Sequence, residues 1–206
     1  MKKVLFIGIV LFGTFCISQN DKEYVNALVL EFEESLKNRN IDTFFHTKRY
    51  CIGDVKIFKL DDGSICISKE TYYEVYFFWQ EENSTLIKKI DNCGLYFSLP
   101  LNGPQVFNFV SEHLEYLKSD PVKKYAVQNP ENVPTAFTQI YSCFRKFNFF
   151  TENDSFIQEY NLFSLTNESK QKNLHYEYNN TLKIVALDKL IDSLISEKGT
   201  MFKRQF

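Results

Sequence analysis

The chain is poor in the residues that build loops and phosphate-binding turns. Its 206 residues include only 7 Gly and 5 Pro, less than the usual share of each, which excludes collagen-like and low-complexity proteins. No glycines follow the spacing of a P-loop, a dinucleotide-binding turn or a nucleophile elbow. The sequence therefore lacks the marks of a nucleotide-dependent enzyme or an elbow-type serine hydrolase, and it predicts no cofactor.

An excess of charge of one sign is also missing. The 24 Lys and Arg residues against 26 Asp and Glu give a formal net charge of −2, which excludes a strongly basic nucleic-acid-binding protein. Hydrophobic residues make up 44% of the chain and aromatic residues 17%. This is enough apolar surface for a hydrophobic core, so we expect a folded domain rather than a disordered chain.

The first eighteen residues have the pattern of a secretory signal peptide. Two lysines follow Met1, an apolar run extends over Val4–Phe15, and Cys16 and Ser18 stand at the −3 and −1 positions of a cut before Gln19. Twelve helical residues span about 18 Å, short of the roughly 30 Å hydrocarbon layer. We therefore expect export to the periplasm or the extracellular space, with no transmembrane anchor after cleavage.

Two further features bear on the predicted location of the protein. The basic head and the Lys- and Asn-rich body are typical of bacterial proteins. Cys16 is an alternative lipidation site that would make the protein a lipoprotein, although the residue before such a cysteine is normally small and here it is Phe15. The domain prediction is a signal peptide over residues 1–18 and a single domain over residues 19–206.

Four cysteines follow the signal region, namely Cys51, Cys66, Cys93 and Cys143. An even number in an oxidising compartment indicates a disulfide framework, and four cysteines permit three complete pairings. We favour Cys51 with Cys66 and Cys93 with Cys143, one short loop and one long one. The alternative is reduced, buried thiols. No pair has C-x-x-C spacing, so we expect no metal site.

The first half of the chain predicts one helix followed by strands. Apolar residues recur every three or four positions over residues 21–37, where Asp21 is suited to cap a helix. The turn sequence at residues 61–64, Asp-Asp-Gly-Ser, predicts a hairpin between residues 55–60 and 65–68. The aromatic segment 71–80 predicts a central strand, and residues 85–90, with a continuation at 95–99, should return antiparallel beside it.

The second half mixes helices and strands. A helix is predicted from Pro104 to Asp120, residues 135–148 fit either helix or strand spacing and are assigned to a helix, and residues 156–165 and 174–178 are paired as a final hairpin. A last helix would begin at Asp188 and leave through a left-handed Gly199. The expected fold class is α+β, an antiparallel meander or sheet of about four to six strands packed against three to four helices.

Candidate catalytic groups are sparse. His46 and Cys51 are close in sequence, which is weak support for a thiol nucleophile. His113 is best explained as a residue at the rim of the core. His175 and Glu177 would share a strand face as a solvated pair. We therefore assign no catalytic, cofactor-binding or metal-binding residue.

The aromatic segment supplies the candidate binding residues Tyr72, Tyr73, Tyr76 and Trp79. Exposed rings of this kind stack on sugars or anchor protein interfaces, but the same rings are also what a core requires, and the core interpretation is favoured. The leading function is a non-enzymatic, exported protein that binds another protein, of the inhibitor or immunity type. The alternatives are a small secreted hydrolase with a non-local acid or Cys/His site, and a carbohydrate or lipid carrier with an aromatic sheet.

Overall fold

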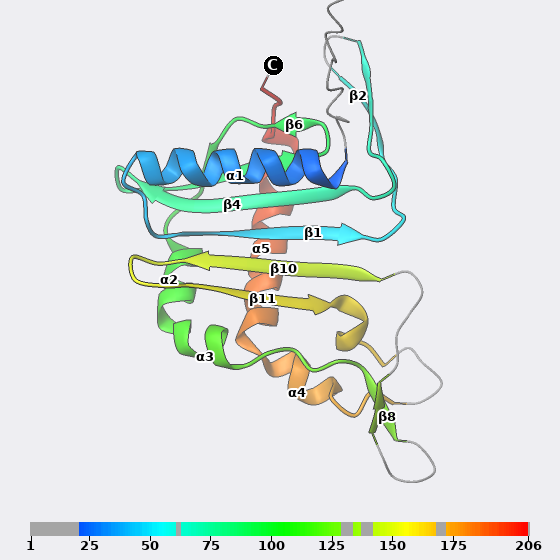
Figure 1. The fold of residues 1–206 in the computed structure, drawn as a ribbon. Coiled ribbons are helices and arrows are strands. Elements are labelled where there is room, and N and C mark those ends of the chain that lie inside the picture. Colours follow the sequence, from blue (N-terminus) through cyan, green and yellow to red (C-terminus); the bar gives the residue numbers. More distant parts are fainter. Residues whose placement is uncertain (1–20, 61–62, 129–133, 137–141, 168–171, 206) are drawn as a thin grey trace, which may run out of the picture.

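The computed structural model describes residues 21–60, 63–128, 134–136, 142–167 and 172–205. Its main feature is an antiparallel seven-stranded sheet in the order β11-β10-β1-β4-β5-β6, with β7 also paired to β5 (Figure 1). The strands are β1 (Phe44–Cys51), β4 (Tyr73–Glu81), β5 (Ser84–Asp91), β6 (Gly94–Leu95), β7 (Leu99–Pro100), β10 (Cys143–Phe150) and β11 (Ser155–Asn161).

Two short hairpins lie outside this sheet. One pairs β2 (Ile57–Lys59) with β3 (Ile65–Ile67), and the other pairs β8 (Ala126–Gln128) with β9 (Pro134–Ala136). The first confirms the hairpin predicted from the Asp-Gly turn.

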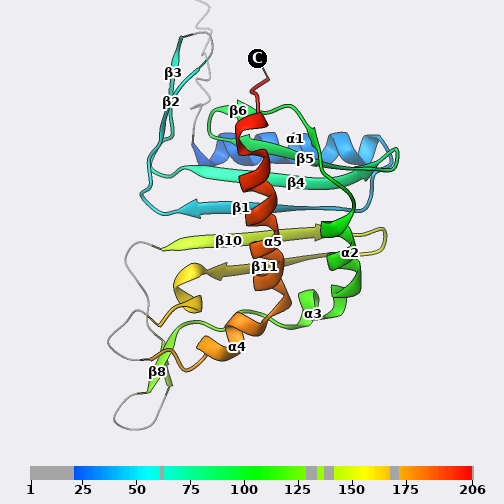
Figure 2. The same ribbon diagram turned by 180° about the vertical axis from the view of Figure 1, so that it is seen from behind.

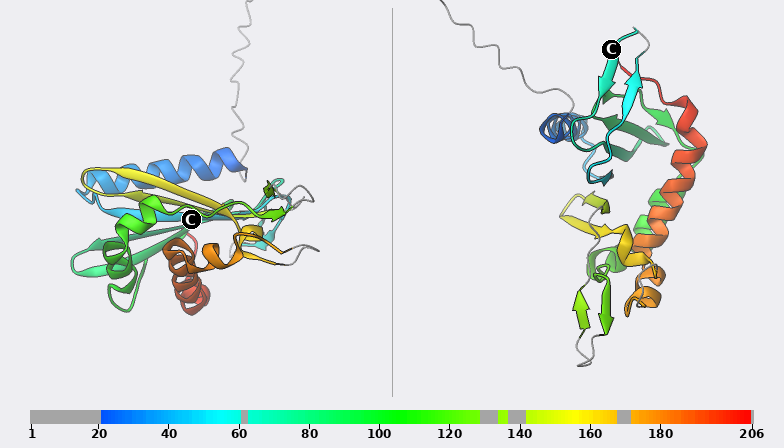
Figure 3. Two further views of the ribbon diagram at one scale, coloured as in Figure 1. Left: turned by 90° about the horizontal axis from the view of Figure 1, so that it is seen from below. Right: turned by 90° about the vertical axis from the view of Figure 1, so that its right-hand side faces the viewer.

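Helices cover both faces of the sheet. The helix α1 (Lys22–Asn38) lies on one face, and Figure 2 shows α2 (Gln105–Glu112) and α5 (Lys183–Lys198) on the other, with α5 running across the strands. The remaining short helices are α3 (Leu114–Ser119), α4 (Tyr176–Thr181), η1 (Leu162–Leu165) and η2 (Gly199–Met201). The α+β class is confirmed, and views from below and from the side in Figure 3 separate the two helical layers.

The two faces form two hydrophobic cores that share the central strand β4. Side chains alternate along a strand, so Phe77 and Trp79 pack with Val29 under α1, while Phe78 packs with Ile191 under α5. A strand covered on both faces must be apolar on both faces. This is why the aromatic segment reads as a nearly continuous apolar run, as predicted for a central strand.

The first helix also follows its local signals. The carboxylate of Asp21 accepts a hydrogen bond from the Tyr24 backbone N–H at 2.9 Å, which is the expected N-terminal cap. The helix ends before Asn40, whose φ of 59° turns the chain toward β1. The predicted bounds and cap are confirmed.

The preferred disulfide pairing is wrong. The structure joins Cys51 to Cys143 and Cys66 to Cys93, over sequence separations of 92 and 27. Cys51 and Cys143 stand directly opposite each other at the ends of β1 and β10. The sheet order, and not the length of the loop, decides which sulfurs meet.

The helix predicted over residues 135–148 is also wrong wherever the structure describes it. Pro134–Ala136 is strand β9 and Cys143–Phe150 is strand β10, while residues 137–141 lie outside the described residues. Phe147 and Phe149 alternate into the core under α5. Pairing to β1 on one side and β11 on the other favours the strand over the helix.

The predicted final hairpin does not form. Residues 155–161 are strand β11, but they pair with β10, and residues 174–178 lead into the short helix α4. Asn173 and Asn179 direct their side-chain amides to the Ser164 carbonyl oxygen at 2.8 Å each. These hydrogen bonds satisfy a buried backbone group without strand pairing.

The last helix begins earlier than predicted. It starts at Lys183, so Asp188 is not its cap but a buried residue inside it, where it contacts Arg49. Gly199 is right-handed, with φ of −49°, and the predicted left-handed exit is wrong. The inward position of Ile191 is confirmed by its complete burial.

The helix predicted from Pro104 to Asp120 is present as two helices, α2 and α3, which meet at His113. Val106 and Leu117 from its apolar stripe are buried in the core under α5. The prediction for residues 1–18, including the lipidation alternative at Cys16, lies outside the described residues. Within the described part, none of the helices is long and apolar enough to span a bilayer.

Candidate binding surface

The β2–β3 hairpin turns its aliphatic side chains outward. Ile57 and Ile67 are paired across the hairpin, and Ile65 is opposite Lys59 on the same face. Ile57 and Ile65 are each 68% exposed, and Val55 and Ile67 are each 47% exposed. We call Val55, Ile57, Ile65 and Ile67 the aliphatic strip.

The hairpin forms for local reasons. Gly63 adopts φ of 84°, a left-handed conformation that glycine takes without strain. Its N–H donates to the Leu60 carbonyl at 2.9 Å, and the Leu60 N–H donates to the Ser64 carbonyl at 2.9 Å. At the base, the Ser68 N–H donates to the Lys56 carbonyl at 3.0 Å, and the Ser68 hydroxyl accepts from the Lys56 N–H at 2.9 Å.

The opposite face of the hairpin is tied to the domain. Cys66, which is buried, forms its disulfide with Cys93 in the turn between β5 and β6. The Phe58 ring packs against Tyr72, with ring centroids 5.2 Å apart, and the Arg204 guanidinium lies 5.3 Å from the centre of the same ring. The strip therefore projects from the sheet on an arm that is covalently held at its inner face (Figure 1).

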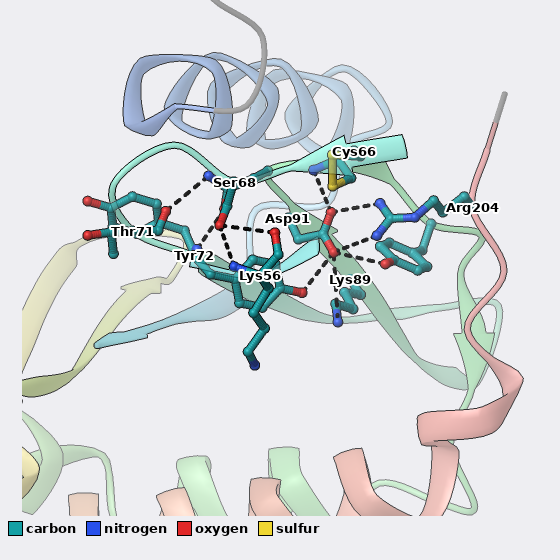
Figure 4. Close-up of a disulfide and its surroundings, with 12 residues drawn as sticks. Lys56, Cys66, Ser68, Thr71, Tyr72, Lys89, Asp91 and Arg204 are labelled. Atoms are coloured by element: carbon teal, nitrogen blue, oxygen red, sulfur yellow. Dashed lines mark hydrogen bonds and ion pairs between the residues drawn. A yellow bond between two sulfur atoms is a disulfide. The ribbon is translucent and has the colours of Figure 1, made fainter. Parts of the chain in front are cut away.

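A buried carboxylate organises the root of this arm. Asp91, at the end of β5, is completely buried, and Arg204 binds both its oxygens at 2.7 and 3.0 Å (Figure 4). The hydroxyls of Tyr72 and Tyr96 donate to Asp91 Oδ2 at 2.9 and 2.8 Å, and the Cys93 N–H donates to Oδ1 at 2.7 Å. Burial and the Asp91 charge both raise the pKa of Tyr72 and of Tyr96, so these hydroxyls stay protonated as donors.

A second buried carboxylate, Asp188, belongs to α5 and lies against the middle of the sheet. Arg49 Nη2 contacts Asp188 Oδ1 at 2.6 Å, the Tyr160 hydroxyl donates to Oδ2 at 2.8 Å, and Arg145 Nε lies 3.3 Å from Oδ2. Arg49 also pairs with Asp192. Burial raises the pKa of Asp188, against the two arginines that lower it. Both oxygens are engaged, so this cluster joins α5 to the sheet and presents no free acid or base.

Two clefts border the sheet, and the first shares Tyr160 with the Asp188 cluster. One of about 450 Å³ is bordered by Lys124, Phe144, Glu159 and Tyr160 near η1. The other, of about 420 Å³, is formed at the β4–β5 turn beside Gly103. Among the described residues, no three His, Cys, Asp or Glu side chains are grouped so as to hold a metal ion.

The aromatic residues proposed for binding are all internal. The exposed fractions of Tyr72, Tyr73, Tyr76 and Trp79 are 3%, 9%, 3% and 1%. The structure thus places them in the cores, as the core interpretation expects, and Tyr72 also holds Asp91. None of these rings presents a face to solvent for stacking.

The histidines are dispersed. His46 is buried, and its Nε2 lies 2.9 Å from Glu33 Oε1 and 3.0 Å from Asn148 Nδ2. Burial lowers the pKa of His46, and the Glu33 carboxylate opposes this effect. Cys51 is bonded to Cys143 and carries no thiol, which excludes a His46–Cys51 catalytic pair.

The other two histidines lie at helix junctions. His113 joins α2 to α3, and its ring packs on Phe109 with centroids 4.7 Å apart. His175 immediately precedes α4, and Glu177 lies in the first turn of that helix. The predicted shared strand face of His175 and Glu177 is therefore wrong.

The comparisons with known proteins leave the family open. No protein-family model matches the chain, and searches of curated proteins and of solved structures return no match either. The function is therefore argued from the chain itself. The aliphatic strip is the surface that sequence reasoning missed, although the alternation Ile-Phe-Lys and Ile-Cys-Ile in its two strands already placed the isoleucines on one face.

Proposed function

We propose that the protein is exported and binds another protein, without catalysis, through the aliphatic strip. The observation that carries this proposal is that three isoleucines, 47–68% exposed, share one face of an arm that is tied by a disulfide, with the exposed Val55 just before its first strand. Single exposed apolar residues are ordinary, but a contiguous patch marks an interaction site. The two disulfides agree with an oxidising compartment outside the cytoplasm.

The arm has the properties of a preorganised ligand. Ordering a flexible loop on binding consumes interaction free energy, and a covalent tether reduces that loss. The Cys66–Cys93 disulfide and the Phe58 contacts hold the hairpin before any partner arrives. A partner with an apolar groove would bury the strip, and an interface of ordinary size covers about 800 Å² on each side. We assign this partner-binding role to an inhibitor or immunity type of protein.

The two alternative functions have weaker support. A carrier would need aromatic rings facing an apolar cavity, and the rings in question pack in the cores. A hydrolase would need an acid or nucleophile free to act, and the most buried carboxylates, Asp91 and Asp188, are each held by arginine and tyrosine.

The test is affinity capture from an envelope extract of the source organism with the oxidised chain from residue 19. The variant Ile57→Asp with Ile67→Asp changes two exposed side chains, so it should fold. We expect the wild type to capture a stoichiometric partner and the variant to lose it. The matched control is Ile157→Asp, at a 60% exposed position on β11, which should retain the partner.

Two results would contradict the proposal. One is a partner that both hairpin variant and wild type capture equally. The other is the absence of any stoichiometric partner together with turnover of an ester or glycoside substrate by the wild type.

A further inference from the structure

Two like-charged pairs lie back to back at neighbouring positions of the sheet. Arg49 of β1 stands opposite Arg145 of β10, and one residue along, Lys48 stands opposite Lys146. Because successive side chains point to opposite faces, the arginines face α5 and the lysines face the side of α1. We call Lys48 and Lys146 the lysine pair.

Close ion pairs form at the arginine pair and, among the described residues, not at the lysine pair. Asp188 contacts both arginines, and Asp192 adds a second carboxylate on Arg49. Over the part of the chain that the structure describes, the lysine pair makes no ion pair within 4.0 Å. Lys48 Nζ donates to the Asn26 side-chain oxygen at 2.5 Å and lies 5.5 Å from the Tyr73 ring centre.

One carboxylate, Glu159, stands beside the lysine pair. Glu159 of β11 is opposite Lys146 in the strand register, but its Oε1 accepts a hydrogen bond from the Tyr50 hydroxyl at 3.2 Å. Like charges directly opposite on a sheet destabilise it, and burial together with the Lys146 charge lowers the pKa of Lys48 to about 8. The Glu159 charge opposes this effect on Lys48 without forming an ion pair within 4.0 Å, so the chain places one non-contacting carboxylate beside two lysines.

The surroundings of the lysine pair are partly buried and partly apolar. The helix α1 packs over β4, β5 and β6, whereas β10 and β11 lie beside it (Figure 1). Next to the lysines on the same face, Tyr50 and Phe144 are opposite each other, with stacked rings 5.2 Å apart. Phe144 and Glu159 also line the cleft of about 450 Å³ near η1.

We propose that the lysine pair binds the carboxylate of a small organic acid, whose apolar part lies on the Tyr50–Phe144 rings and extends toward this cleft. A carboxylate has two oxygens and so serves both ammonium groups, as Asp188 serves both arginines on the opposite face. Aromatic rings beside the charge favour an acid with an apolar body over a bare inorganic anion. This site is separate from the aliphatic strip and goes beyond the proposed function.

The experiment titrates the oxidised chain with sodium benzoate, sodium acetate and sodium sulfate, at an ionic strength held constant with sodium chloride. Binding is followed by amide chemical shifts and by the urea midpoint. We expect saturable shifts at β1 and β10 for all three anions, with benzoate at least threefold tighter than acetate. Equal affinity for benzoate and acetate would overturn the role of the rings, and an absence of saturable shifts would overturn the site.

Matched variants separate this site from general charge effects. Lys146→Glu supplies an internal carboxylate and should weaken benzoate binding at least tenfold, while Lys189→Glu makes the same charge change on an exposed residue of α5 and should leave it unchanged. If Lys146→Glu fails to fold, Lys146→Met gives the same test. Glu159→Gln removes the competing carboxylate and should tighten binding. Unchanged affinity in both Lys146 variants would overturn the proposal.

Discussion

Asp91 and Asp188 are two buried carboxylates with similar ligands and different positions in the chain. Each is bound by arginine and by tyrosine hydroxyls. Asp188 is held by Arg49, in the middle of the central sheet, whereas Asp91 is held by Arg204, in the terminal segment after η2. Asp188 joins α5 to the sheet. Asp91 holds the root of the β2–β3 arm and the segment after η2.

This difference predicts that the stability lost on breaking a buried ion pair depends on whether the remaining charged side chain can reach solvent. Arg49 is 7% exposed and is flanked by paired strands on both sides. Arg204 belongs to a segment attached to the sheet through a few backbone bonds, among them Gln205 N–H to the Leu95 carbonyl at 2.8 Å. If its carboxylate is removed, the Arg204 guanidinium can therefore reach water far more easily than the Arg49 guanidinium can.

The largest effect is therefore expected at Asp188. Asp188→Ala should lower the free energy of unfolding by about 3–5 kcal/mol, because it leaves the buried Arg49 guanidinium with only the half-exposed Asp192 as a counter-charge. Urea unfolding of the oxidised chain measures it. The double variant Arg49→Met with Asp188→Leu should recover most of the loss, since an apolar pair needs no counter-charge. A loss below about 1 kcal/mol for the single variant would break the comparison.

The next effect concerns the disulfide beside Asp91. Replacing Cys66 and Cys93 together by alanine should lower the free energy of unfolding by about 3–4 kcal/mol, from the loop entropy of a 27-residue separation. Hydrogen exchange should accelerate in β2 and β3 and remain slow in β4. Replacing Cys51 and Cys143 instead should leave exchange in the hairpin unchanged. Equal acceleration in both variants would show that the arm is not held by its own disulfide.

Asp91→Asn should have a smaller effect, about 2 kcal/mol in the free energy of unfolding. Hydrogen bonds to a charged group are lost, which accounts for this magnitude, but Arg204 can turn out to solvent. Urea unfolding of Asp91→Asn and Asp188→Ala under the same conditions shows which variant loses more stability. A loss at Asp91 equal to or greater than that at Asp188 would contradict the argument from chain position.

The smallest effect is expected at Lys48, a partly buried charge that, unlike Arg49 and Arg204, has no carboxylate in contact with it. The pKa of Lys48 is lowered to about 8 in the folded chain, against 10.5 for an ordinary lysine. Between these values the unfolded chain holds more protons than the folded chain, so stability should rise with pH. We expect Lys48 to contribute a rise of about 1 kcal/mol between pH 8 and 9.5, after discounting for partial exposure. This contribution is the difference between the wild type and Lys48→Met, because buried tyrosines such as Tyr72 and Tyr96, whose pKa is raised, act in the opposite direction.

Variants assign this rise to its source. The pKa of Lys88 is also lowered to about 8, chiefly by burial, so Lys48→Met should reduce the pH slope without removing it. Lys189→Met, at an exposed site, should keep the wild-type slope. Unfolding curves in urea at several pH values measure both. An unchanged slope in Lys48→Met would show that Lys48 is charged normally in the folded chain.

Where a signal was local, the sequence was sufficient. Three features follow from preferences of a few neighbouring residues. They are the helix cap at Asp21, the glycine turn of the β2–β3 hairpin, and strand β4, which is apolar on both faces. Each appears in the structure at the expected place. The isoleucine alternation in the hairpin was equally readable, although its exposure was not, because a period of two does not say which face is covered.

What the sequence determined by itself is the α+β class, the central strand and the presence of four cysteines suited to disulfides. Only the tertiary structure decided that Cys51 meets Cys143, that residues 143–150 extend beside β1, and that Asp188 lies inside a helix against Arg49. These outcomes depend on pairing between segments far apart in the chain, where the free energy comes from packing and from buried charge and not from local preference.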